Sequence, residues 1–363
     1  MIHCKIYIYS TSEHISQLCT GFQLLESQKK IELSYNFNAY SRNGKTPLQT
    51  VRPYDLQGMF VVVNNTITIF YDTTDGERLL TEALEVSDFY FKRSYRPQAI
   101  PDQYKDVVFP LGLNYEVYTG MFDKLEFSRF FANSRNFKSP KELLKSVLRN
   151  IGLKYNPTIN NMHRAPQRAH KPKVLFMART WNPDNYTGGY PAENWEVWKS
   201  LCNNINKTRA TVIRTLRKEL GYQFYGGFSQ NQYTADNYRD LLLSDEGASA
   251  KKRYINRLSE YPICIATTGL YNSIGWKFGE YVAFSKAIVS EKLNHHVPGD
   301  FERGKNYSEF STAEECVEEA FILFEDNAAR EQMMENNYQY YNQYLAPDKM
   351  VWRTLEKAIG KSL

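Results

Sequence analysis

Two charged residues, Lys277 and Glu280, follow an apolar stretch and a loop that contains glycines. The stretch ICIATT ends at Thr268, and the loop with Gly269 and Gly275 leads from it toward Lys277. This order predicts a strand, a loop and a helix that starts near Lys277, whose free N–H groups would favour a phosphate. Lys277 adds a full charge, and the Glu280 carboxylate can accept hydrogen bonds from a diol such as ribose. The segment therefore predicts half of a nucleotide site, or else an ordinary helix start with a favourable acid.

Further candidates for a ligand site follow other predicted strands. Arg179 comes directly after KVLFMA and is a second candidate phosphate ligand, with a surface arginine as the alternative. Gly226 and Gly227 follow YQFY and would let the backbone approach a donor, unless they form a plain turn.

Candidates for proton transfer lie near the start of the chain. Glu13 and His14 follow the first predicted strand, and a histidine with a pKa near neutrality suits a general base. The alternative is that Ser12 caps a helix and Glu13 favours its dipole. Asp72 follows the stretch ITIFY and is a further catalytic candidate.

Composition limits the classes of protein to consider. The 363 residues exceed what one core usually accommodates, so we expect two domains. No stretch reaches the roughly 20 apolar residues of a membrane span, and the first residues do not read as a secretory signal, so we expect a cytoplasmic protein. The five cysteines form no C-x-x-C pair and the histidines no H-x-x-x-H pair, so we expect no metal site. A net charge of +5 and the lack of a recognisable module argue against nucleic acid.

The candidate residues must be positioned by strands that alternate with helices. Apolar, β-branched runs and helical patterns alternate twice along the chain, which predicts parallel sheets covered on both faces. In such sheets ligands bind beyond the carboxyl ends of the strands, where the candidate residues lie. We expect an α/β fold of two Rossmann-like domains that face a central cleft. The expected parts are a first domain (1–135), a basic helix and linker (136–172), a second domain (173–345) and a last helix (346–363).

A basic segment separates the two predicted domains. Residues 136–173 contain nine basic residues and one acid. Ser139, Pro140 and Glu142 predict a helix start there. A solvated linker is one interpretation. The other is contact with anionic lipid head groups at the inner face of the cytoplasmic membrane.

The C-terminal half resembles a known family. The sequence EYVAFSKAIV at 280–289 is similar in spacing to the E-A-M-A-x-G-x-P-V-V segment of GT-B fold glycosyltransferases, and VLFMARTWNP resembles members from bacterial surface-polysaccharide clusters. The resemblance covers residues 173–360 and implies that Glu280 binds the ribose of a sugar nucleotide and that the last helix crosses back onto the first domain. The position eight residues before Glu280, where retaining members carry a second acid, is Asn272. Ser285 and Ala287 stand in place of the family's Gly and Pro, so retaining or inverting stereochemistry stays open.

These observations and the resemblance together predict a metal-independent glycosyltransferase. Its donor would be a nucleotide-sugar, and its acceptor a glycan or a lipid-linked oligosaccharide of bacterial O-antigen, capsule or lipopolysaccharide biosynthesis. The alternatives are a non-catalytic carbohydrate-binding protein and a GT-B-like nucleotide-sugar epimerase or hydrolase. The residues expected to bind the donor are Glu280, Lys277, Arg179, Gly275, Asn272, Thr268 and Gly227, and the catalytic candidates are His14, Glu13 and Asp72.

Overall fold

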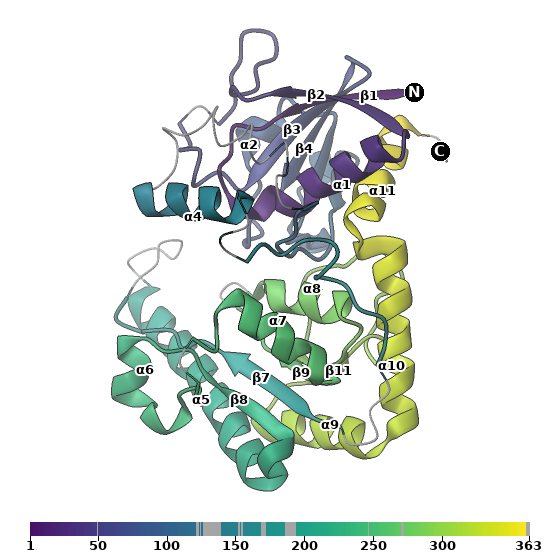
Figure 1. Cartoon of the computed structure of the whole chain (residues 1–363). Coiled ribbons are helices and arrows are strands. Elements are labelled where there is room, and N and C mark those ends of the chain that lie inside the picture. The colour runs from purple at the N-terminus through teal and green to yellow at the C-terminus, as the bar shows by residue number, and fades with distance from the viewer. Residues whose placement is uncertain are drawn as a thin grey trace.

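The computed structural model shows two α/β units, one above the other in Figure 1. It describes residues 1–48, 50–120, 123, 125, 139–151, 153, 155–167, 172–185, 194–245, 247–269 and 272–360. Within these ranges no helix is both long and apolar enough to cross a membrane.

The N-terminal unit is built on a six-stranded sheet in the order β2-β1-β3-β4-β5-β6. Its strands β1 and β2 are parallel, as are β4, β5 and β6. The 3-10 turn η1 (Glu13–Ile15) and helix α1 follow β1 and lead toward β2. The elements are β1 (Ile2–Tyr7), α1 (Ser16–Ser27), β2 (Ile31–Asn36), β3 (Gly58–Val63), β4 (Ile67–Asp72), α2 (Thr81–Leu84), β5 (Phe89–Lys92), η2 (Pro97–Ala99), η3 (Asp102–Tyr104) and β6 (Val108–Pro110).

Strand β3 departs from the predicted parallel arrangement. It runs antiparallel to both β1 and β4. The cause is a tight turn at Asn64 and Asn65, whose φ angles of 50° and 60° lie in the left-handed region that such hairpin turns require. The stretch GERLLTEALEVSD between β4 and β5 forms only the short helix α2 (Thr81–Leu84), and Leu80 before it is extended.

The C-terminal unit holds a five-stranded, wholly parallel sheet in the order β11-β10-β9-β7-β8. Helix α4 (Pro140–Asn150) precedes it and begins as predicted, because the Ser139 side chain accepts a hydrogen bond from the Glu142 amide. The elements are β7 (Val174–Ala178), α5 (Trp195–Leu220), η6 (Gly221–Gln223), β8 (Phe224–Phe228), α6 (Gln232–Asn237), η7 (Arg239–Leu241), α7 (Lys251–Glu260), β9 (Ile263–Ala266), α8 (Trp276–Ala283), β10 (Ala287–Glu291), β11 (Ser308–Phe310), α9 (Ala313–Glu325) and α10 (Asn327–Tyr340).

The last helix crosses back onto the N-terminal unit, as predicted. A π-helical turn (Tyr341–Leu345) links α10 to α11 (Pro347–Ile359), which packs along α1. The backbones approach so closely that a Cβ on Gly21 of α1 would lie 2.1 Å from the Pro347 carbonyl oxygen. One hydrophobic cluster therefore continues through both units, and includes Phe22, Tyr281 and Val351. The predicted α/β class with two Rossmann-like units is confirmed.

Candidate functional site

A cavity of about 600 Å³ lies between the two units. The C-terminal unit lines most of it, with the ends of β7 and β9 and the start of α8. The N-terminal unit contributes His14, Asp75 and Arg93. The cavity thus lies beyond the carboxyl ends of parallel strands, where ligands bind in sheets of this kind.

Helix α8 points its first turn at this cavity. Gly275 is the N-cap residue and supplies no side-chain cap, and the first turn holds no acid. The first N–H groups of the helix are therefore available to an anion. The predicted helix start near Lys277 is confirmed, since α8 begins at Trp276. The N-terminal unit packs closely against α8. A Cβ on Gly279 of this helix would lie 3.0 Å from the carbonyl oxygen of Asn114.

Lys277 lies in the cavity wall, half-buried. Its ammonium group donates a hydrogen bond to the Met177 carbonyl at the end of β7. Burial, opposed by Glu280 and aided by Arg209 and Arg179, lowers the pKa of Lys277 to about 8. No carboxylate in the described part of the chain forms an ion pair with Lys277. Its charge is therefore poorly compensated, and an anion in the cavity would supply the missing partner.

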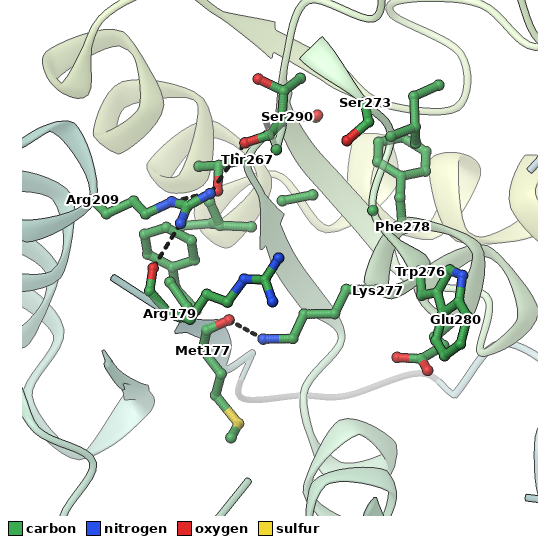
Figure 2. A pocket seen from close by; sticks show the side chains of 18 of the residues that line it. Met177, Arg179, Arg209, Thr267, Ser273, Trp276, Lys277, Phe278, Glu280 and Ser290 are labelled. Carbon is green, nitrogen blue, oxygen red and sulfur yellow. Dashed lines mark hydrogen bonds between the residues drawn. The ribbon is translucent and has the colours of Figure 1, made fainter. Parts of the chain in front are cut away.

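Two arginines converge on the same side of the cavity (Figure 2). Arg179 follows β7 as predicted, and its guanidinium lies 4.1 Å from the centre of the Trp181 ring. Arg209 extends from α5 and is only 5% exposed. Its guanidinium donates to the Thr267 hydroxyl at 2.9 Å, to the Arg179 carbonyl at 2.7 Å and to the Thr268 carbonyl at 3.1 Å. Burial lowers the pKa of Arg209 to about 10.

Arg209 holds the loops after β7 and β9 together, and the sequence analysis did not select it. Asn206, one turn earlier on α5, exchanges hydrogen bonds with the Trp181 backbone at 2.9 and 2.7 Å. Both residues lie on the buried face of α5 together with Cys202 and Ile213. Two polar residues on an otherwise apolar helix face are a signal that the sequence does contain.

Glu280 reaches the cavity from the second turn of α8. Its side chain is 3% exposed, and one carboxylate oxygen, Oε1, accepts a hydrogen bond from the Lys251 ammonium group at the start of α7. Figure 2 shows the carboxylate across the cavity from Arg209. Of the other predicted donor-site residues, Gly275 and Thr268 also line the cavity. The Thr268 amide and hydroxyl both donate to Glu291 at 2.6 Å, which fixes the start of the loop between β9 and α8.

The N-terminal unit presents a histidine and an arginine to the cavity. The His14 ring packs against the Trp276 ring with centroids 4.6 Å apart. Burial and then Arg93 lower the pKa of His14 to about 4, so its ring is neutral at pH 7. Arg93 donates to Asp75 at 2.6 Å and also to the Ile274 carbonyl just before α8, which joins the two units beside the cavity.

Five predicted site residues do not line the cavity. Asp72 is fully buried, 3.0 Å from the equally buried Lys92 ammonium group, so its carboxylate is paired inside the N-terminal unit and away from the cavity, and its expected catalytic role stays a prediction. Glu13 pairs instead with Arg149 and Lys145 of α4.

The other three, Gly226, Gly227 and Asn272, are backbone features, and Gly226 lies in β8 beside Gly227. Gly227 lies in β8, where a Cβ would meet the Leu241 carbonyl oxygen at 2.7 Å, so packing explains this glycine. Asn272 is exposed and has a φ of 54°, so it serves the turn before α8.

Comparison with known proteins gives only remote likenesses. No protein-family model and no curated protein matches the chain. Among solved structures, Anabaena Alr3699/HepE in complex with UDP and glucose is similar at a TM-score of 0.41 and 11% identity, over 93% of this chain and 89% of that one.

Two further structures are similar at the same level. A putative UDP-N-acetylglucosamine 2-epimerase from Listeria monocytogenes is similar at a TM-score of 0.37 and 11% identity, over 94% of this chain and 71% of that one. The C-terminal domain of a group 1 glycosyl transferase from Francisella tularensis is similar at a TM-score of 0.32 and 12% identity, over 50% of this chain and 95% of that one. At these TM-scores the likenesses carry no inference about function, which we take from the site itself.

Proposed function

We propose that this chain transfers a sugar from a nucleotide-sugar donor to a glycan or lipid-linked acceptor. The observation that carries the proposal is the cavity between the units. It combines cations and the uncapped start of α8 with a buried carboxylate on one side, and a neutral histidine from the other unit. These are the groups that sugar transfer needs, namely a site for the diphosphate, a ligand for the ribose and a base for the acceptor.

The charges in the cavity wall support a diphosphate as ligand. Among the described residues five cations line the cavity, and two of them are paired with the two acids found there, Asp75 with Arg93 and Glu280 with Lys251. Within the described residues the other three, Arg179, Arg209 and Lys277, have no carboxylate at ion-pair distance. A nucleotide-sugar carries its two negative charges on the diphosphate, so this excess of positive charge suits it.

Glu280 and His14 take the remaining roles in the proposed reaction. Lys251 occupies Oε1 of Glu280, which leaves Oε2 to accept a hydrogen bond from a ribose hydroxyl. His14 belongs to the unit opposite the donor and is unprotonated at neutral pH, so it is the candidate to accept the proton of an acceptor hydroxyl if the enzyme inverts. Its pKa of about 4 makes it a weaker base than the near-neutral histidine that the sequence analysis expected. Arg179 and Lys277 stabilise the departing nucleoside diphosphate.

Pathway, metal use and membrane contact are finer parts of this proposal. We propose a role in bacterial surface-polysaccharide assembly without a metal ion, which activity in EDTA would test.

We also propose peripheral membrane contact through residues 136–173. Within this segment Lys141 and Leu144 are exposed and are the residues that we expect to contact a membrane. Lys145 and Arg149 are already paired with Glu13. Binding of Lys141→Glu to anionic liposomes would test it.

A thermal-shift panel with UDP, GDP, ADP, CMP and dTDP tests the donor site. A nucleotide at about 100 times its Kd stabilises the fold by roughly 2.7 kcal/mol, and we expect one to do so for the wild type and not for Glu280→Gln. Glu309→Gln is the matched control, because Glu309 is also ion-paired and mostly buried but does not line the cavity. No shift with any nucleotide would contradict the proposal.

A second assay separates transfer from the alternatives. Incubation of a radiolabelled nucleotide-sugar with and without candidate glycan acceptors shows whether sugar is transferred, released to water or epimerised. Transfer that is lost in His14→Ala supports a base in the N-terminal unit. Release or epimerisation without transfer would assign the site to a hydrolase or an epimerase.

A further inference from the structure

We propose that Lys251 positions the Glu280 carboxylate for the donor, and that Glu116 of the N-terminal unit holds Lys251 in place. This inference rests on the proposed function, because it concerns the residue that we expect to bind ribose. It adds that donor binding by the C-terminal unit depends on a carboxylate of the other unit.

The contact between Lys251 and Glu280 fixes one half of the carboxylate. Lys251 is the first residue of α7, lines the cavity and has a side chain that is 22% exposed. Burial alone would lower the pKa of Lys251, but Glu280 and Glu116 outweigh burial and raise it. The ammonium group therefore stays charged and holds Oε1 of Glu280. Oε2 is then left for a ligand.

The same ammonium group faces a second carboxylate, that of Glu116, at 3.8 Å. Glu116 is buried in the segment that follows β6 (Val108–Pro110), and this segment is fixed to the start of α1. The Tyr115 amide donates to Gln17 at 3.2 Å, and the Thr20 hydroxyl donates to the Val117 carbonyl at 2.8 Å. Glu116 is therefore a rigid point of the N-terminal unit.

Glu116 is itself held by a further ion pair. Arg149 of α4 lies 2.8 Å from the other oxygen of Glu116 and 2.7 Å from Glu13. Lys145 adds a contact of 3.4 Å to Glu13. Three carboxylates and three cations thus alternate from Glu280 to the surface, and their charges balance. Charges removed from water persist only with such partners, so the position of each depends on its neighbours.

Removal of the Glu116 carboxylate should therefore change the position of the Glu280 carboxylate, although Glu116 itself does not line the cavity. With one carboxylate left, the Lys251 ammonium group is free to bridge both oxygens of Glu280 or to turn into the cavity. In either case fewer acceptors remain for a ribose. Arg179 and Lys277, the proposed ligands of the diphosphate, form no ion pair with a member of this network among the described residues, although Glu280 and Lys251 both act on the pKa of Lys277.

Isothermal titration of the full chain with UDP, GDP, ADP, dTDP and inorganic pyrophosphate tests the proposal. We expect Glu116→Gln to bind the preferred nucleoside diphosphate about five- to tenfold more weakly than the wild type, and to bind pyrophosphate, which has no ribose, with unchanged affinity. Glu309→Gln, outside the cavity, should change neither. An unchanged nucleotide Kd in Glu116→Gln, or an equal loss for pyrophosphate, would overturn the proposal.

A double-mutant cycle shows whether the effect passes through Lys251. In a Lys251→Met background the substitution Glu116→Gln should have no further effect on nucleotide affinity, whereas additive losses would overturn the proposed route. If Lys251→Met does not fold, Lys251→Arg takes its place as the background. A smaller loss of nucleotide affinity on adding Glu116→Gln in that background supports the route, and an undiminished loss overturns it. Failure of the wild type to bind any nucleoside diphosphate would overturn the proposed function and this inference with it.

Discussion

Replacement of Lys277 by methionine should stabilise the free protein and weaken donor binding. The ordinary pKa of 10.5 falls to about 8 in the fold, which corresponds to a cost of about 3 kcal/mol for the charged form at pH 7. Methionine has a similar length and carries no charge. It loses the hydrogen bond to the Met177 carbonyl, which offsets about 1 kcal/mol of the gain. We therefore expect Lys277→Met to unfold with a free energy about 1 to 2 kcal/mol above that of the wild type.

The size of this stability difference should fall as pH rises between the folded and unfolded pKa values of Lys277. Between pH 8 and 10.5 the folded wild type has lost the Lys277 proton while the unfolded chain still holds it, so the wild type gains stability as pH rises. Urea unfolding at pH 7.0 and pH 9.5 should therefore show the advantage of Lys277→Met shrink at the higher pH. A variant less stable than the wild type at pH 7.0, or a difference independent of pH, would refute the reasoning.

Lys286 provides a matched control for this prediction. It is 3% exposed, burial lowers its pKa to about 8, and it does not line the cavity. Lys286→Met should show the same dependence of stability on pH. Nucleotide affinity, measured by titration calorimetry, should fall about tenfold or more in Lys277→Met and stay unchanged in Lys286→Met.

Three other substitutions test the fold and the site. Gly21→Ala would place a Cβ 2.1 Å from the Pro347 carbonyl oxygen, so we expect a loss of about 1 to 3 kcal/mol in urea unfolding; an unchanged midpoint would contradict the close packing. Asp72→Asn leaves the buried Lys92 ammonium group unpaired and should cost about 3 to 5 kcal/mol, with little change in nucleotide affinity for whatever fraction folds; a selective loss of affinity would return Asp72 to the site. Arg209→Lys cannot bridge the loops after β7 and β9, so calorimetry should show about tenfold weaker nucleotide binding, and wild-type affinity would argue against this role.

Local signals in the sequence predicted what local structure decides. The start of α8 and the cap at Ser139 are each fixed by a few adjacent residues, and both were found. The Asn64-Asn65 turn is equally local, so the reversed direction of β3 could have been predicted from it. The same holds for Asn206 and Arg209 on the apolar face of α5.

Contacts between distant segments could not be predicted in this way. Nothing near Glu116 or Lys251 in the sequence indicates that the two side chains meet, because they lie 135 positions apart and belong to different units. Asp72 shows the converse. Its place after a strand favoured a role in the cleft, but the neighbouring strand β5 supplies Lys92, which buries and pairs the carboxylate.

The path of α11 also bears on how the chain is made. The Gln17 side chain donates a hydrogen bond to the Leu345 carbonyl, 328 residues later, and the Tyr71 hydroxyl lies 2.6 Å from that of Thr354. A ribosome adds roughly 5 to 20 residues per second, so roughly 16 to 66 seconds pass between the synthesis of α1 and that of α11, which covers it. Throughout that interval the apolar face of α1 is open to aggregation. We expect the nascent chain to need a chaperone until α11 emerges.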